Sequence, residues 1–277
     1  MSNNQVVENK NYADILNALN EQFATNVNRI YIHSLDREVG FREIKVAEQK
    51  TLAKIFIDNE NRPDIIYDAQ VALIENLCLE KENVNFKELT ELDRIKIMIE
   101  LYQSNFFKNS TSFKCKECGT ENKYEIDFEN LIQKINNEKF EDINYKKKSN
   151  ERIFEIILGF PTINKLSKFH KLVYLSSRNK ISKKIEISDM IDMFIKNINI
   201  INKDGSNINI DSDKLSIEEF ESILEKLPID IIYNEDGVIG EINRSFFKRI
   251  EKLFDKPKCK ECGYEEDGEI SISDFFI

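Results

Sequence analysis

One hexapeptide, Lys-Cys-Lys-Glu-Cys-Gly, occurs twice in this chain, at residues 114–119 and 258–263. We call the two copies the first and second knuckle, and they hold four of the five cysteines: Cys115, Cys118, Cys259 and Cys262. A Cys-x-x-Cys pair lets one tight turn present two sulfurs to a metal ion, and zinc prefers four ligands in a tetrahedron. Because each knuckle offers only two ligands, we predict that the knuckles meet and share one structural Zn²⁺ per chain.

The neighbours of the cysteines fit such a site. Gly119 and Gly263 can adopt positive φ, which turns backbone N–H groups back toward the sulfurs. Four thiolates around a divalent ion leave a net charge of about −2. Four lysines beside the cysteines can offset that charge: Lys114, Lys116, Lys258 and Lys260.

The rest of the chain offers few other metal ligands. Cys78 lies in a predicted apolar helix and is expected to be buried and inert. His170 lies on the apolar face of another predicted helix and is expected to be a core histidine, not a metal ligand. The role of His33 stays open.

Two other uses of the cysteine pairs remain open. A thioredoxin-type redox pair opens a helix in a βαβ unit, whereas a glycine and a strand-like segment follow each knuckle here. Local disulfides, or ancestral ligands that no longer hold metal, are further alternatives. The separation of the knuckles is also much longer than the roughly 15–20 residues between the pairs of a zinc ribbon.

Composition narrows the class of protein. The chain has 277 residues with a formal net charge of −10, which argues against broad phosphate binding. No stretch approaches the ~20 apolar residues of a membrane span. An odd number of cysteines, mostly in tight pairs, favours a reducing compartment.

Hydrophobic patterning predicts a mainly helical α+β fold in two halves. We expect a flexible leader and first helix in residues 1–30, an N-terminal half with the first knuckle in 31–145, and a C-terminal α+β half with the second knuckle in 146–277. The polar segment 136–150 is the expected linker, and a helix is expected to carry the apolar residues between 187 and 198. Short strands are expected after each knuckle, around 124–128 and 270–272.

The two halves share an order of features that indicates an internal duplication. Phe41 aligns with Phe160, Thr90 with Ser216, and Cys115 with Cys259. Thr90 and Ser216 are both predicted helix caps, each with an acidic residue three positions later. Similar caps in two unrelated helical halves would give the same pattern, so this alternative is kept.

Catalytic signatures are absent from the sequence. There is no Gly-rich phosphate loop, no Ser-His-Asp pattern and no nucleotide fingerprint. We therefore predict that the chain is not an enzyme, with no small-molecule substrate and no catalytic or cofactor-binding residues.

The order of motifs resembles a known family. The segments that carry the resemblance are the first knuckle with the strand Tyr124-Glu-Ile-Asp-Phe128, the segment Leu158-Gly-Phe-Pro-Thr162, the Ser216-Ile-Glu-Glu-Phe220 helix, the second knuckle and the closing Asp274-Phe275-Phe276. Over roughly residues 30–277 they are similar to the baseplate hub subunit family of T-even-like contractile-tailed bacteriophages (myoviruses). The knuckles and the closing Asp-Phe-Phe are the most specific parts.

The resemblance implies a structural or assembly protein of the phage tail baseplate hub. Its partners would be other hub, spike or tail-tube proteins, and it would be found in the virion tail or in the host cytoplasm during assembly. The alternatives are a zinc-ribbon regulator that binds nucleic acid through lysines near the knuckles, and a thiol oxidoreductase. Phe275, Phe276 and Ile277 either close the core or form a docking element.

Overall fold

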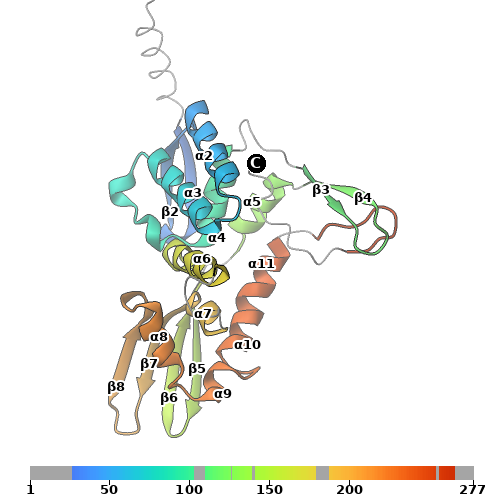
Figure 1. Cartoon of the computed structure of the whole chain (residues 1–277). Coiled ribbons are helices and arrows are strands. Elements are labelled where there is room, and N and C mark those ends of the chain that lie inside the picture. The colour runs from blue at the N-terminus through green and yellow to red at the C-terminus, as the bar shows by residue number, and fades with distance from the viewer. Residues whose placement is uncertain are drawn as a thin grey trace, which may run out of the picture.

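The computed structural model describes residues 27–102, 110–125, 127–138, 141–178, 187–253 and 256–265. The predicted leader helix before residue 27, the strand at 270–272 and the terminal Phe275–Ile277 lie outside the described residues. The fold is a mixed α+β arrangement with a helical upper part, a sheet below it and an arm at one side (Figure 1).

The upper part combines one β-hairpin with three helices. Its elements are β1 (Val27–Ile32), β2 (Arg37–Arg42), α2 (Val46–Asp58), α3 (Pro63–Leu77) and α4 (Glu91–Tyr102), with 3-10 turns at His33–Leu35, Lys81–Asn83 and Phe86–Glu88. Pro63 opens α3 at a position where its missing N–H costs nothing. At the start of α4, the Thr90 N–H donates to the Asp93 carboxylate and the Asp93 N–H donates to the Thr90 hydroxyl, as the predicted cap requires.

Helix α4 is the centre of the molecule, because every residue from Leu92 to Ile99 is buried. One face packs with β1, β2, α2 and α3, and Ile97 and Met98 belong to that cluster. The other face carries Leu92, Ile95 and Ile99 into a second cluster formed with the C-terminal elements. The two hydrophobic cores therefore meet across a single helix.

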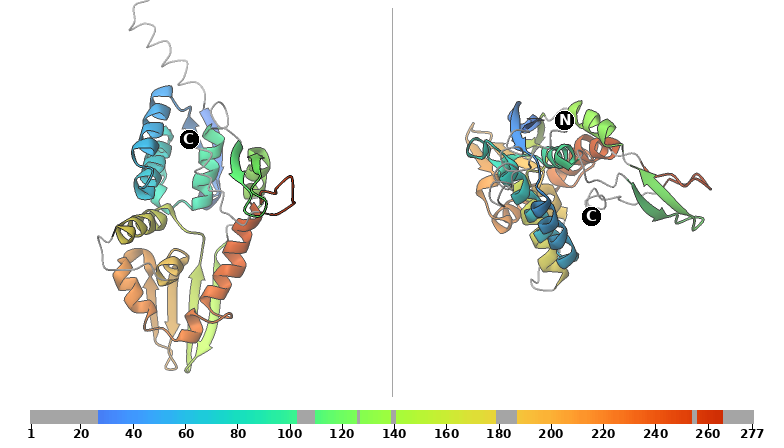
Figure 2. Two further views of the ribbon diagram at one scale, coloured as in Figure 1. Left: turned by 45° about the vertical axis from the view of Figure 1, so that its right-hand side comes forward. Right: turned by 90° about the horizontal axis from the view of Figure 1, so that it is seen from above.

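The lower part is a four-stranded antiparallel sheet with helices on one face (Figures 1 and 2). The strand order is β5 (Ile143–Ser149), β6 (Arg152–Leu158), β7 (Ile195–Ile201) and β8 (Asn207–Asp211). The helices beside the sheet are α7 (Ile187–Asp192), α8 (Ile217–Leu224), α9 (Ile229–Ile232), α10 (Val238–Ile242) and α11 (Lys248–Leu253), with a 3-10 turn at Ser212–Lys214 and a π-turn at Asn243–Phe247. Two further helices lie where the two parts meet (Figure 1): α5 (Phe128–Asn136) packs against α4, and α6 (Ile163–Ser177) packs against α3. The predicted Ser216–Glu219 capping box opens α8.

Three expectations about local structure are wrong. The segment 136–150 is not a linker, because residues 143–149 form β5 and pair along their whole length with β6. The helix expected over 187–198 ends at Asp192, and β7 begins at Ile195. The strand expected over 124–128 ends at Glu125, and α5 begins at Phe128. The predicted boundary between residues 145 and 146 thus falls inside β5, and the two-half division stays a prediction.

Both knuckles lie in an arm beside the main body. The hairpin of β3 (Ser110–Lys114) and β4 (Glu121–Glu125) projects from the side that carries α5 and α11, and residues 256–265 run along it (Figures 1 and 2). We call these two segments the cysteine arm.

Candidate metal centre

The first knuckle is the turn that joins β3 to β4. Lys114 pairs with Glu121 at the end of the ladder. Inside that pair, the Cys115 N–H donates to the Thr120 carbonyl at 3.0 Å, and the Gly119 N–H donates to the Cys115 carbonyl at 2.9 Å. Gly119 has φ of +74°, a left-handed conformation that glycine adopts without steric cost.

The second knuckle repeats this geometry. Lys258 pairs with Glu265, the Cys259 N–H donates to the Tyr264 carbonyl at 2.9 Å, and the Gly263 N–H donates to the Cys259 carbonyl at 2.9 Å. Gly263 has φ of +72°. Identical hexapeptides therefore fold into matching turns, each presenting two sulfurs.

The four sulfurs of the two knuckles converge, as predicted. Cys115 Sγ lies 3.7 Å from Cys262 Sγ, and Cys118 Sγ lies 3.5 Å from Cys259 Sγ. All four lie within 4.8 Å of one another. With zinc–sulfur bonds of about 2.3 Å, the edge of a tetrahedral site would be about 3.8 Å. This four-cysteine cluster can therefore hold a metal ion, and all four thiols are free of disulfides.

Hydrogen bonds give the thiols unequal acidities. The backbone N–H of Cys262, aided by the N–H of Glu261 and the amide of Asn122, lowers the pKa of Cys259 to about 6. The Thr120 side chain and backbone lower the pKa of Cys118. At Cys262, the Tyr264 N–H favours the thiolate, but desolvation and the neighbouring sulfurs outweigh it and raise the pKa to about 12. A bound divalent cation would offset the unfavourable effect of the neighbouring sulfurs on the Cys262 thiolate, since a coordinated thiol is deprotonated.

Sequence reasoning missed Asn122, which contacts both knuckles. Its side chain is buried in the arm with 4% exposure. Nδ2 lies 3.4 Å from Cys259 Sγ and 2.9 Å from the Thr120 carbonyl, and Oδ1 accepts from the Lys260 N–H at 2.9 Å. Its position two residues beyond Thr120, on the strand that leaves a Cys-x-x-Cys-Gly turn, was the only signal in the sequence.

The other candidate ligands lie outside the four-cysteine cluster. Cys78 caps the C-terminal end of α3 and is buried, and desolvation raises the pKa of its thiol. His170 lies on α6 with its ring 4.8 Å from that of Tyr67. His33 follows β1 and lies near Asn136 and Asp93. None of the three joins the sulfurs in the cluster.

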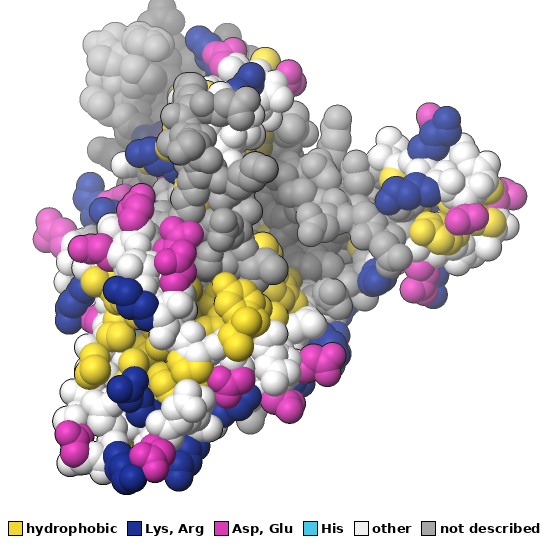
Figure 3. Space-filling model, turned by 60° about the horizontal axis from the view of Figure 1, so that its bottom comes forward, with side chains coloured by type: hydrophobic (Ala, Val, Ile, Leu, Met, Phe, Trp, Pro, Cys, Tyr) yellow, Lys and Arg dark blue, Asp and Glu magenta, His cyan; other side chains and the backbone are white. Residues whose placement is uncertain are grey.

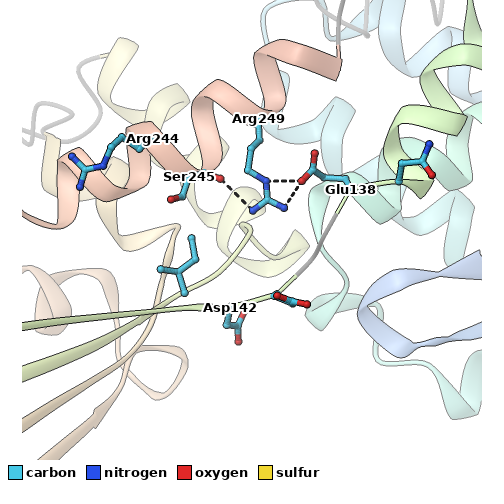
Figure 4. A pocket seen from close by; sticks show the side chains of 8 residues that line it. Glu138, Asp142, Arg244, Ser245 and Arg249 are labelled. Atoms are coloured by element: carbon cyan, nitrogen blue, oxygen red, sulfur yellow. Dashed lines mark hydrogen bonds and ion pairs between the residues drawn. The ribbon is translucent and has the colours of Figure 1, made fainter.

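A second concave site lies between the end of α5, the start of β5 and the α10–α11 segment. It has a volume of about 400 Å³ and is lined by Asn137, Glu138, Glu141, Asp142, Ile143, Arg244, Ser245 and Arg249. Figure 4 shows Arg249 turned toward Glu138, with which it forms an ion pair. Arg244 pairs with Glu241, and Asp142 pairs with Lys196. These charges join neighbouring elements, which favours a structural role for the cleft over a catalytic one.

Comparisons with known proteins give one match, to a family. Neither the curated proteins nor the solved structures contain a match to the chain. Within the described residues, every helix is too short or too polar to cross a bilayer. A family model described as T4 bacteriophage base plate protein matches residues 24–277. The match spans both knuckles and all the described elements, and the chain therefore belongs to the T4 bacteriophage base plate protein family.

Proposed function

We propose that this chain is a structural or assembly subunit of the baseplate hub, where it binds other hub, spike or tail-tube proteins. Family membership makes it a structural component of a phage tail baseplate, in the virion tail, among other tail proteins. That match is the observation that carries the proposal. The more specific assignment to the hub rests in addition on the motif resemblance, which includes both knuckles and the Phe160–Thr162 segment.

The proposal includes one Zn²⁺ per chain, bound by Cys115, Cys118, Cys259 and Cys262. The support is the convergence of four sulfurs at spacings near those of a tetrahedral site. A link between Cys118 and Cys259 spans 141 residues. By the loop-closure model used for disulfides, such a link removes about 5 kcal/mol of chain entropy from the unfolded state.

We also propose the division into two halves, at residues 31–145 and 146–277, and their origin by duplication. The matching geometry of the two knuckles and the acidic capping boxes at Thr90 and Ser216 support it. The halves differ mainly in their sheets: the four-stranded sheet lies mostly in the second half, whereas the first half has the two hairpins β1–β2 and β3–β4.

A role in contacts is supported by apolar side chains left on the surface. Figure 3 shows hydrophobic side chains gathered on the underside of the molecule, flanked by charged ones. Large exposed side chains of the C-terminal part are Met190, Ile208, Ile229, Tyr233 and Phe247. Ile208 is 50% exposed on β8, an edge strand whose five residues include no lysine or proline to discourage pairing.

Reconstitution with the other baseplate proteins of the same phage tests the proposal. We expect stable complexes with hub, spike or tail-tube proteins and about ten-fold weaker binding for Ile208→Lys. Ile57→Lys is the matched control, because Ile57 is 72% exposed on α2, in the other part of the fold.

Two results would reject the hub assignment. One is binding to wedge proteins without any binding to hub, spike or tail-tube proteins. The other is salt-dependent retention on DNA in place of protein complexes, which would favour the nucleic-acid alternative. Mass spectrometry of purified virions then separates a resident subunit from an assembly factor that stays in the host cytoplasm.

A further inference from the structure

The contact between the two knuckles contains a polar side chain that is not one of the cysteines. Asn122 lies on β4, paired with Phe113 on β3, so the hairpin fixes its position from the first knuckle. Only 4% of it is exposed. A buried amide is costly unless its donors and acceptor are satisfied, so the partners of Asn122 define what it does.

The partners of Asn122 fix the orientation of its amide. The Lys260 backbone N–H can only donate, so the atom that faces it at 2.9 Å must be the carbonyl oxygen Oδ1. The amide nitrogen Nδ2 then faces the Thr120 carbonyl at 2.9 Å and Cys259 Sγ at 3.4 Å. The contact with Thr120 stays beside the first knuckle, and the other two reach the second knuckle, 137 and 138 residues further along the chain.

These contacts divide into two kinds. The bond from the Lys260 N–H joins backbone to side chain and needs neither a thiolate nor a metal. The bond to Cys259 Sγ places a donor beside a sulfur that would carry negative charge in a metal site. The hydroxyl oxygen that Cys118 Sγ contacts, by contrast, belongs to Thr120, the residue after its own knuckle.

We propose that Asn122 docks the second knuckle onto the first in the absence of metal, and that it then positions the Cys259 sulfur for the shared ion. Asn122 is thus a positioning residue. The cysteine arm is asymmetric, because the hairpin of the first knuckle is the platform and the second knuckle is the segment that docks. Only the second clause rests on the proposed zinc site.

Docking without metal is tested by disulfide trapping in the chelator-treated full-length protein. Diamide takes up two electrons and two protons from a pair of thiols, which become one disulfide while diamide becomes its hydrazine. In the wild-type protein we expect peptide mapping to find Cys118–Cys259 and Cys115–Cys262, the pairs at 3.5 and 3.7 Å.

The trapping result should depend on residue 122. We expect Asn122→Ala to slow the cross-knuckle products about ten-fold and to favour disulfides within each Cys-x-x-Cys pair. Lys123→Ala is the matched control, because Lys123 is the next residue on β4 and its side chain is 60% exposed. Unchanged cross-knuckle trapping in Asn122→Ala would overturn the docking claim.

Metal positioning has its own readout. Competition with a chromophoric chelator should give a Zn²⁺ affinity lowered about 10- to 100-fold in Asn122→Ala, and altered thiolate-to-metal bands with Co²⁺. Asn122→Asp keeps the size and the acceptor for Lys260 but loses the donor, so it should also lose affinity even if the alanine variant folds poorly.

The two proposals fail in different ways. A wild-type protein that binds no metal would reject the zinc site, while the trapping experiment would still decide on docking. Wild-type metal affinity in both Asn122 variants would reject the positioning claim, while the zinc site would stand.

Discussion

Cys118 Sγ and Cys259 Sγ lie 3.5 Å apart although 141 residues separate them. Every element from β4 to α11 lies within the loop that these two sulfurs close, including the whole four-stranded sheet. Outside the cysteine arm, the lower part of the fold also joins the upper part through α4 and α6. The Glu91 N–H donates to the Pro161 carbonyl, and the Ile163 N–H donates to the Leu89 carbonyl.

Replacement of one ligand tests the metal and its contribution to stability. We expect Cys118→Ser to reduce bound zinc from one per chain to well below one and to lower the thermal midpoint, because three thiolates remain where four converge. Metal analysis and calorimetry are the measurements. Cys78→Ala is the control, since Cys78 is a buried thiol at the end of α3 and should keep full metal content even as the protein loses stability. Equal zinc content in Cys118→Ser and wild type would contradict the site.

Stability should rise with pH through the histidine range. Burial lowers the pKa of His170, so the folded state holds that proton less tightly than the unfolded chain, whose histidine titrates near 6.5. Below the folded-state pKa, protonation of His170 lowers the stability of the protein by its full amount. This loss of stability disappears as the pH rises above the pKa of the unfolded chain. We expect greater resistance to urea at pH 7.5 than at pH 5.5, with each unit of difference in pKa contributing about 1.4 kcal/mol.

The pH dependence of stability should be compared between wild type and a His170 variant, both free of metal. His170→Gln should reduce the pH dependence, and His33 should account for part of the remainder because burial also lowers its pKa. The measurements belong in metal-free protein, since proton uptake by the cysteines would weaken a metal site over the same range. An identical pH slope for wild type and His170→Gln would rule out this role of His170.

Lys165 should be a strong determinant of stability in the lower part. Its side chain is only 6% exposed, and its ammonium donates to the carbonyls of Asp192 and Ile195 and to the Ser212 hydroxyl. Lys165→Met keeps the aliphatic stem and removes these donors, so we expect a loss of about 1–3 kcal/mol in urea denaturation. The control is Lys168→Met, which changes an exposed lysine on the same helix. Equal stability of the two variants would show that the ammonium of Lys165 is dispensable.

The Arg249–Glu138 ion pair should couple α11 to the segment that directly follows α5. Their side chains are 23% and 21% exposed, and the Arg249 guanidinium also lies 5.1 Å from the centre of the Phe160 ring. A double-mutant cycle with Arg249→Met and Glu138→Gln should give a coupling of about 1 kcal/mol. The pair Lys203–Glu151, at 76% and 68% exposure, serves as the solvent-exposed comparison and should give about 0.3 kcal/mol or less. Equal coupling in the two cycles would contradict the structural role.

The features that were predictable from the sequence are those fixed by local chemistry. The cysteine turns need the glycine at positive φ, and the caps at Thr90 and Ser216 need an acidic residue three positions on. Convergence of the knuckles followed from a shortage of ligands. That argument required no knowledge of the fold between them.

The features that escaped prediction depend on distant partners. In β5, the half-buried residues Ile143, Tyr145 and Lys147 alternate with exposed ones. The lysine triplet from 146 to 148 has the composition of a loop, so the period of two expected of a strand is not visible in the sequence. After Asp192, the isoleucines fit a helix or a strand equally well, and pairing of β7 with β6 and β8 decides between them. The amide of Asn122 gains its role only when Lys260 and Cys259 arrive from the far end of the chain.

The distance along the chain between the knuckles has a consequence for synthesis. At translation rates of about 5–20 residues per second, the first knuckle leaves the ribosome roughly 7–30 s before the second. During that interval its two thiols have no intramolecular partners from Cys259 and Cys262. Two nascent chains on one messenger each carry an open half-site with the same hexapeptide, and neighbouring chains can then exchange knuckles to give a domain-swapped pair.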